Sequence, residues 1–86
     1  MYTELKERLS VILRNQFLVD TTGLRSWKYL EDLGLTQPEK KELLNLFEDE
    51  FNINISEKDE RSIRTIRDTV FIIQQNLGTE SLLKTA

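Results

Sequence analysis

Glu48 and Asp49 are the first residues to consider for chemistry, because paired carboxylates can act as general acid and general base. Adjacent residues of a helix point in different directions, however, and no third group in the sequence orients this pair. The chain has no cysteine and no histidine, which excludes disulfides, thiol nucleophiles, the common zinc sites and imidazole proton transfer. We therefore expect no catalytic residue, no metal site and no enzyme activity in this chain.

Acidic residues recur along one side of a helix predicted over residues 36–51. They are Glu39, Glu42, Glu48 and Asp49, and two lysines dilute their charge at one end. Such a face can meet a basic patch on a partner protein, in a contact governed by electrostatic steering and by salt. A solvated helix face explains the same pattern equally simply. The four residues are therefore a candidate partner-binding surface.

Three arginines near the C-terminal end, Arg61, Arg64 and Arg67, offer a possible basic patch. Helical i,i+4 spacing also allows Glu57 to pair with Arg61 and Glu60 to pair with Arg64. We favour this pairing over a basic patch.

Length and composition narrow the class of protein. The chain has 86 residues, 38% of them hydrophobic and 31% charged, with three glycines and one proline. This balance is typical of one small helix-rich domain, so we treat residues 1–86 as a single domain and expect a monomer. The net charge of -3 provides no cationic surface for phosphates, and nucleic acid is not an expected partner.

The apolar segments are too short for a membrane. The longest uninterrupted apolar run is Val70-Phe71-Ile72-Ile73, whereas a membrane-spanning helix needs roughly 18 apolar residues. The first residues alternate charged with apolar side chains and do not form the core of a signal peptide. We expect no membrane span and a cytoplasmic location.

The spacing of apolar residues predicts the elements that position these side chains. Apolar residues recur at intervals of three and four over residues 3–17, which predicts a first amphipathic helix. Residues 18–35 predict a long, partly ordered loop, fastened to the helices by Trp27, Tyr29 and Leu33. Thr36 and Glu39 form a capping box that starts the second helix, which continues through Phe51.

Two further caps start the last two helices. Ser56 caps a brief helix that reaches Ser62. Thr65, with Asp68 three residues later, starts a final helix that ends near Leu77-Gly78, and residues 78–86 are expected to be a frayed tail.

This order of elements, together with several short motifs, resembles the acyl carrier proteins of fatty acid and polyketide synthesis. The matching residues are Leu30-Glu31-Asp32-Leu33-Gly34, Glu42-Leu43, Phe47-Glu48-Asp49-Glu50-Phe51, Ile55, Ile63, Thr65-Ile66 and Ile73. The pattern can be laid along residues 4–77 without a gap. The resemblance implies an all-α, acyl-carrier-like four-helix bundle with a long first loop and a short third helix.

The resemblance breaks at the residue that carries the chemistry of the family. There, Asp-Leu-Gly is followed two residues later by Asp-Ser-Leu, and the serine carries the 4'-phosphopantetheine arm. Here those three positions read Thr36-Gln37-Pro38. Glutamine has no hydroxyl to attack the pyrophosphate of coenzyme A. We therefore expect no cofactor, and 4'-phosphopantetheine only if another serine, Ser26 or Ser56, takes the place of Gln37.

The positions that line the acyl pocket of the family are occupied by Leu44, Phe47, Ile55 and Ile63. Apolar stripes of this kind are core residues by default. Phe71 adds bulk beside them, so we expect a tighter interior that is less suited to sheltering an acyl chain.

The favoured function is that of a carrier-like adaptor or regulator without a prosthetic arm. It would dock through Glu39, Glu42, Glu48 and Asp49 on a protein with a basic patch, such as an enzyme of acyl metabolism. A working acyl carrier modified at Ser26 or Ser56 is the first alternative. An unrelated helical protein-interaction module is the second.

Overall fold

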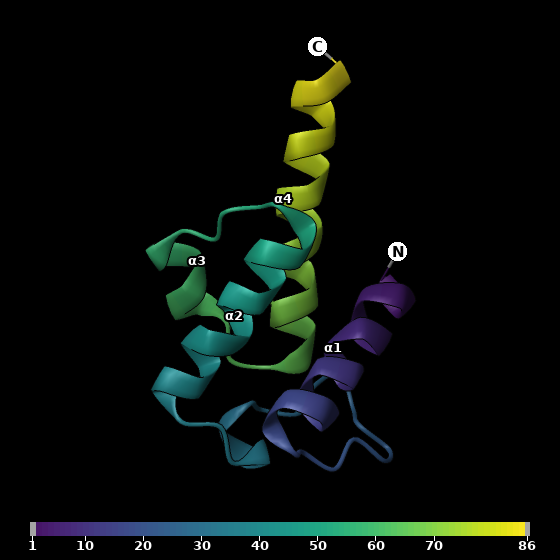
Figure 1. Ribbon diagram of the computed structural model, residues 1–86, viewed down its shortest axis with the longest axis vertical. Coiled ribbons are helices and arrows are strands. Elements are labelled where there is room, and N and C mark those ends of the chain that lie inside the picture. Colours follow the sequence, from purple (N-terminus) through teal and green to yellow (C-terminus); the bar gives the residue numbers. More distant parts are fainter. Residues whose placement is uncertain (1, 86) are drawn as a thin grey trace.

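The computed structural model describes the backbone of residues 2–85 and the side chains of residues 2–77. Within this part of the chain, four α-helices and one short 3-10 helix follow one another. They are α1 (Tyr2–Phe17), η1 (Glu31–Leu33), α2 (Gln37–Phe51), α3 (Glu57–Ser62) and α4 (Ile66–Thr85). Figure 1 shows α1 on one side of α4, with α2 and the short α3 on the other. The predicted all-α fold with a long first loop and a short third helix is confirmed.

The core lies where the apolar stripes of the helices meet. Leu9 and Leu13 of α1 are fully buried, and α1 packs against α4, whose Val70 and Ile73 are also fully buried. Phe47 from α2 is fully buried in the same cluster. Apolar side chains spaced by three or four residues on each helix thus supply one continuous core.

The helix caps predicted at Thr36 and Thr65 are present in the structure. Glu39 N donates to Thr36 Oγ1 at 3.3 Å, and Thr36 N donates to the Glu39 carboxylate at 3.0 Å, which completes the capping box of α2. Thr65 and Asp68 form the same reciprocal pair before α4, with both distances 3.1 Å. These bonds satisfy backbone N–H groups that a helix start otherwise leaves without partners.

The sequence predicted that aromatic rings attach the loop over residues 18–35 to the core, but the structure shows other contacts. Trp27 is 69% exposed and Tyr29 is 47% exposed, so neither ring fastens the loop to the core. Leu30 and Leu35 are buried instead, and Leu30 N donates to Arg64 O at 2.8 Å. Backbone hydrogen bonds can hold a loop whatever its side chains are, so aromatic content was a poor guide here. Leu33 packs against the core as expected.

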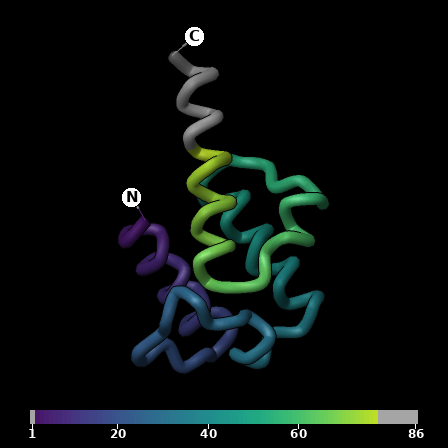
Figure 2. Tube along the Cα trace, turned by 180° about the vertical axis from the view of Figure 1, so that it is seen from behind, coloured from purple at the N-terminus to yellow at the C-terminus, as the bar shows by residue number. Residues whose placement is uncertain are grey.

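Two further backbone hydrogen bonds extend this attachment. Ile66 N donates to Lys28 O at 3.0 Å, and Arg67 N donates to Ser26 O at 2.8 Å. The first N–H groups of α4 therefore bind the loop, and Tyr29 and Thr65 form an isolated antiparallel bridge beside them. Figure 2 shows the loop, in blue, against the end of the molecule where α4 begins.

The position of Phe71 and the end of α4 both differ from the prediction. Phe71 does not add bulk to the interior, because it is 44% exposed and packs edge-on against Tyr2, with the Arg67 guanidinium 5.2 Å from its ring centre. The bounds of α4 extend past the end predicted near Leu77 and Gly78. The tail predicted to be frayed, 78–86, lies outside the residues whose side chains are described.

Candidate functional site

Gln37 is the first residue of α2, and its side chain is exposed. Thr36 precedes it as the N-cap, in an extended conformation, and Pro38 follows in the first turn, where its missing N–H costs nothing. The local sequence therefore keeps a complete helix start at this point. What it lacks is a nucleophile, because a carboxamide does not attack phosphorus.

The hydroxyl of the preceding residue, Thr36, already makes two hydrogen bonds. Thr36 Oγ1 accepts from Glu39 N and donates to the Glu39 carboxylate at 3.0 Å. Using this hydroxyl as a nucleophile would break the capping box, at a cost of about 1 kcal/mol for a typical N-cap. Thr36 therefore has a structural role as the N-cap of α2.

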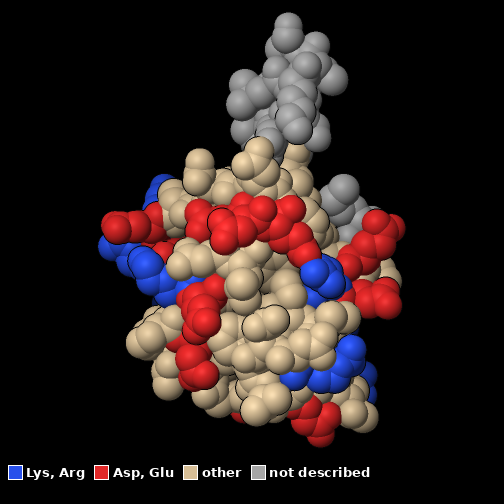
Figure 3. Space-filling model, viewed as in Figure 1, with Lys and Arg blue, Asp and Glu red and all other residues tan. Residues whose placement is uncertain are grey.

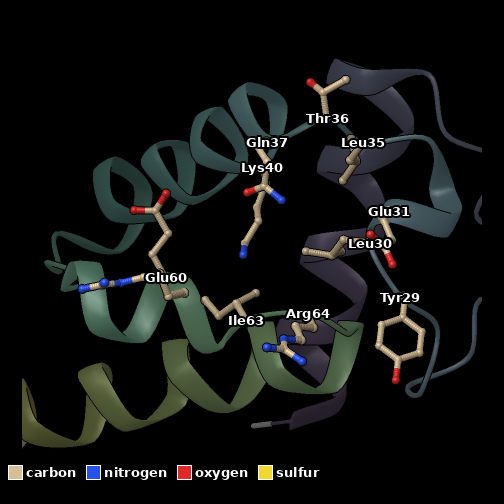
Figure 4. A pocket seen from close by; sticks show the side chains of 11 residues that line it. Tyr29, Leu30, Glu31, Leu35, Thr36, Gln37, Lys40, Glu60, Ile63 and Arg64 are labelled. Carbon is tan, nitrogen blue, oxygen red and sulfur yellow. The ribbon is translucent and has the colours of Figure 1, made fainter.

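An open cleft of about 490 Å³ lies beside Gln37, between the start of α2 and the segment that joins α3 to α4. Its lining includes Gln37 and Lys40 from α2, and Ile63 and Arg64 from the joining segment. In Figure 4 the Gln37 amide and the Lys40 ammonium group both point into the opening. Volumes of this size are typical of sites for small molecules.

Ser26 lies in the loop and not at a helix start. Its hydroxyl accepts from Tyr2 Oη at 2.9 Å, and its carbonyl oxygen accepts from Arg67 N. The side chain is half-buried. Ser26 thus helps to join α1, the loop and α4.

Ser56 lies at the start of α3 and is exposed. Its hydroxyl accepts from Asp59 N at 3.1 Å, which caps a helix of six residues. Neither Ser26 nor Ser56 lines the cleft beside Gln37. Gln37 and the two alternative attachment residues, Ser26 and Ser56, therefore lie in three different environments.

The four acidic residues predicted to contact a partner divide into two pairs. The Glu39 carboxylate is used in the capping box, and the Glu48 carboxylate accepts from Ile55 N at 2.9 Å. Glu42 and Asp49 are both exposed, and they lie on the same side of α2 because seven residues are close to two helical turns. Figure 3 shows carboxylates gathered near the C-terminal end of α2.

Sequence reasoning missed an ion pair between α1 and α2. The Arg8 guanidinium binds the Glu50 carboxylate through two nitrogens, with Nε 2.7 Å from Oε1. This hydrogen bond raises the pKa of Arg8 above its ordinary value. The pair lies far apart in sequence, and no local pattern marks it. One of the acidic residues at the end of α2 is therefore already neutralised within the chain.

The arginines near the C-terminal end do not form the predicted pairs. The Glu60 carboxylate lies 4.0 Å from Lys41 Nζ, and Arg61 Nε donates to the backbone oxygen of Glu57 at 3.4 Å. Helix α3 ends at Ser62, so Glu60 and Arg64 do not share a helix and the i,i+4 rule does not apply to them. Among the described residues, no group of three or more side chains suited to a metal ion occurs.

No protein-family model matches the chain. An acyl carrier protein from Phytoplasma australiense is 31% identical over 73 residues, which cover 84% of this chain and 96% of that protein. An acyl carrier protein from Solidesulfovibrio magneticus is 29% identical over 73 residues, covering 84% and 94%. The crystal structure of an acyl carrier protein from Thermotoga maritima superposes with a TM-score of 0.85 at 22% identity, covering 91% of this chain and 92% of that one. No described helix is long and apolar enough to cross a membrane.

Proposed function

Because this chain belongs to the acyl carrier protein family, we propose that it acts as a carrier-like adaptor or regulator of acyl metabolism that bears no prosthetic arm at residue 37. The observation that carries the proposal is Gln37 at the first position of α2, inside an intact capping box. The family frame is kept, while the residue at the proposed attachment point has no hydroxyl. The cytoplasmic location and the monomeric state stay predictions from composition.

The proposed partner is an enzyme or assembly factor of acyl metabolism that presents a basic patch. Glu42 and Asp49 are the acidic residues best placed for this contact, because both are exposed and share one side of α2. Glu39 and Glu48 support it from the same helix but also stabilise the fold through their hydrogen bonds. Opposite charges at such a surface mainly accelerate association and set orientation.

Incubation with coenzyme A and a phosphopantetheinyl transferase tests the missing attachment directly. We expect the intact mass of the protein to remain unchanged, whereas attachment of the arm adds about 340 Da. Gln37→Ser is the matched control, because it restores a hydroxyl at the start of α2, and this variant should gain the added mass. A mass gain in the unaltered protein would contradict the proposal, and failure of Gln37→Ser to react would show that a serine at residue 37, between Thr36 and Pro38, is not sufficient for attachment.

The same experiment addresses the working-carrier alternative. If the unaltered protein gains mass, Ser26→Ala and Ser56→Ala identify the modified serine, since only one of them should abolish the gain. Both hydroxyls already accept hydrogen bonds within the fold, and this supports the arm-free proposal over the alternative.

A further inference from the structure

Aromatic rings and cations meet on the surface formed by the start of α1, the loop over residues 18–35 and the first turns of α4. This aromatic-basic surface consists of Tyr2, Arg25, Trp27, Lys28, Arg67 and Phe71. Figure 2 shows the loop, in blue, below the first turns of α4, in green, and α1, in purple, packs against α4. The three segments are far apart in the sequence, so the surface exists only in the folded chain.

Side-chain contacts join the three segments. The Arg67 guanidinium lies 5.2 Å from the centre of the Phe71 ring, and Phe71 packs edge-on against Tyr2 with the ring centres 6.3 Å apart. Tyr2 Oη donates to Ser26 Oγ at 2.9 Å, and Arg67 N donates to Ser26 O at 2.8 Å. These contacts order Arg67 and the two rings before any partner binds, which lowers the entropy cost of association.

Arg25, Trp27 and Lys28 extend the surface on either side of Ser26. Lys28 N donates to Arg25 O at 3.1 Å, which closes a tight turn, and all three side chains line one hollow of the loop. Trp27 is 69% exposed and Phe71 is 44% exposed, so both rings offer apolar area to another molecule. Aromatic residues and arginine are enriched at protein interfaces, and tryptophan, tyrosine and arginine often dominate the binding energy there.

The three cations of this surface form no ion pair with a carboxylate of any described residue. Two nearby carboxylates are engaged by the backbone, because Asp20 accepts from Thr22 N at 3.0 Å and Asp68 accepts from two N–H groups just before α4. Asp20 and Asp32 also line the hollow of the loop. A uniformly negative membrane or nucleic acid would face these carboxylates too, whereas a protein segment can place its own carboxylates against the cations alone.

We propose that the aromatic-basic surface docks an acidic segment of a partner protein. Carboxylates of the segment contact Arg25, Lys28 and Arg67, and an apolar side chain of the segment packs against Trp27 and Phe71. The opposite charges select and orient the segment, while the rings supply the apolar contact. The inference goes beyond the proposed adaptor contact through α2, because it gives the chain a second docking surface of opposite charge.

Titration of the ¹⁵N-labelled full chain with a synthetic peptide, followed by NMR, tests this surface. Glutamates flank a leucine in the peptide, one control peptide has glutamines in place of the glutamates, and another has alanine in place of the leucine. We expect the acidic peptide to shift the amide signals of Arg25, Lys28, Arg67 and Phe71 and the indole N–H signal of Trp27, and both controls to bind more weakly. Absence of these shifts at millimolar peptide, or equal binding of the glutamine control, would overturn the proposal.

Paired variants decide whether the cations hold the segment. Arg25→Gln with Arg67→Gln should weaken binding of the acidic peptide about tenfold, the factor that corresponds to about 1.4 kcal/mol. Arg14→Gln with Lys58→Gln makes the same change in net charge at exposed positions outside the surface and should leave the affinity nearly unchanged. Equal weakening in the two double variants would overturn the assignment.

Trp27→Ala keeps every charge and tests the apolar part of the contact. Because the ring is exposed, this variant should fold, and it should bind the acidic peptide several-fold more weakly than the unaltered protein. If the double variant at Arg25 and Arg67 does not fold, Trp27→Ala and the control peptides decide. Unchanged affinity in Trp27→Ala would overturn the place assigned to the segment.

Two measurements distinguish other occupants of the surface. Co-sedimentation with vesicles of phosphatidylserine and phosphatidylcholine tests a membrane, and sedimentation equilibrium tests a second copy of the chain, whose acidic α2 side offers carboxylates. We expect neither to bind at this surface. Binding of either one that the double variant at Arg25 and Arg67 abolishes would overturn the assignment to a partner protein. None of these results depends on the mass experiment at Gln37.

Discussion

Thr36 and Glu39 hold the start of α2 through hydrogen bonds in both directions, and Gln37 lies between them. The helix start and the covalent chemistry of the family are separable at this point, because capping needs the residues on either side of position 37 and attachment needs the residue itself. A chain can therefore lose the hydroxyl and keep the local geometry. This separation makes Gln37→Ser a clean test of residue 37.

Thr36→Ala removes the capping hydroxyl and should lower the free energy of unfolding by about 1 kcal/mol, within the usual range of roughly 0.5 to 2 kcal/mol for an N-cap. The reason is that Glu39 N loses its acceptor at the end of a helix. Urea unfolding followed by circular dichroism measures the change. Thr36→Ser keeps the oxygen and should stay close to the unaltered protein, so a large loss in that variant would show that the methyl group matters more than the cap.

At the scale of elements, the loop over residues 18–35 is attached to the start of α4 by its backbone. Ser26 and Lys28 accept hydrogen bonds from the first residues of α4, and Leu30 donates one to Arg64 O. The exposed rings of Trp27 and Tyr29 contribute little to this attachment. The loop and the arginine-bearing segment before α4 are thus one structural unit, which places Leu30 and Arg64 beside the same cleft.

Leu30→Ala and Trp27→Ala separate the two ways of holding the loop. Leu30 is 3% exposed, and its truncation should cost about 2 to 5 kcal/mol, as is usual for a buried leucine. Trp27 is 69% exposed, and its truncation should change stability by about 0.5 kcal/mol or less. Chemical denaturation of both variants measures the difference. A larger loss in Trp27→Ala than in Leu30→Ala would restore the aromatic anchoring that the sequence alone favoured.

At the scale of the whole molecule, charge is unevenly distributed. The net charge is -3, yet the cleft beside Gln37 has a basic rim while exposed carboxylates lie along α2. Contacts between exposed charges are screened over about 8 Å at physiological ionic strength, so association through the α2 carboxylates should weaken as salt is raised. The acidic side of α2 suits a basic protein.

Glu42→Lys with Asp49→Lys should slow association with the partner about tenfold or more and should weaken the dependence of the association rate on salt. The partner is first identified by cross-linking, then purified, and association is measured by surface plasmon resonance at several salt concentrations. Glu7→Lys with Asp32→Lys makes the same change in net charge at exposed positions outside α2 and should have a much smaller effect. Equal effects of the two double variants would mean that overall charge, and not the α2 surface, controls association.

The sequence by itself determined the helices and the missing nucleophile. Apolar spacing and the caps at Thr36, Ser56 and Thr65 depend on residues within a few positions of one another, so helix starts could be predicted without knowledge of the fold. The replacement of serine by Gln37 can also be read directly once the family resemblance is recognised. Each of these features depends only on residues that are close together in the sequence.

Only the tertiary structure decided which side chains act together. The structure brings Lys40 and Arg64 to one cleft, joins Arg8 to Glu50, and uses Glu48 to hold the N–H of Ile55. These contacts join residues from different elements, and their geometry depends on how the helices pack around the core. The spacing of residues along the chain could not predict these contacts, because it says nothing about the distance in space between residues that are far apart in the sequence.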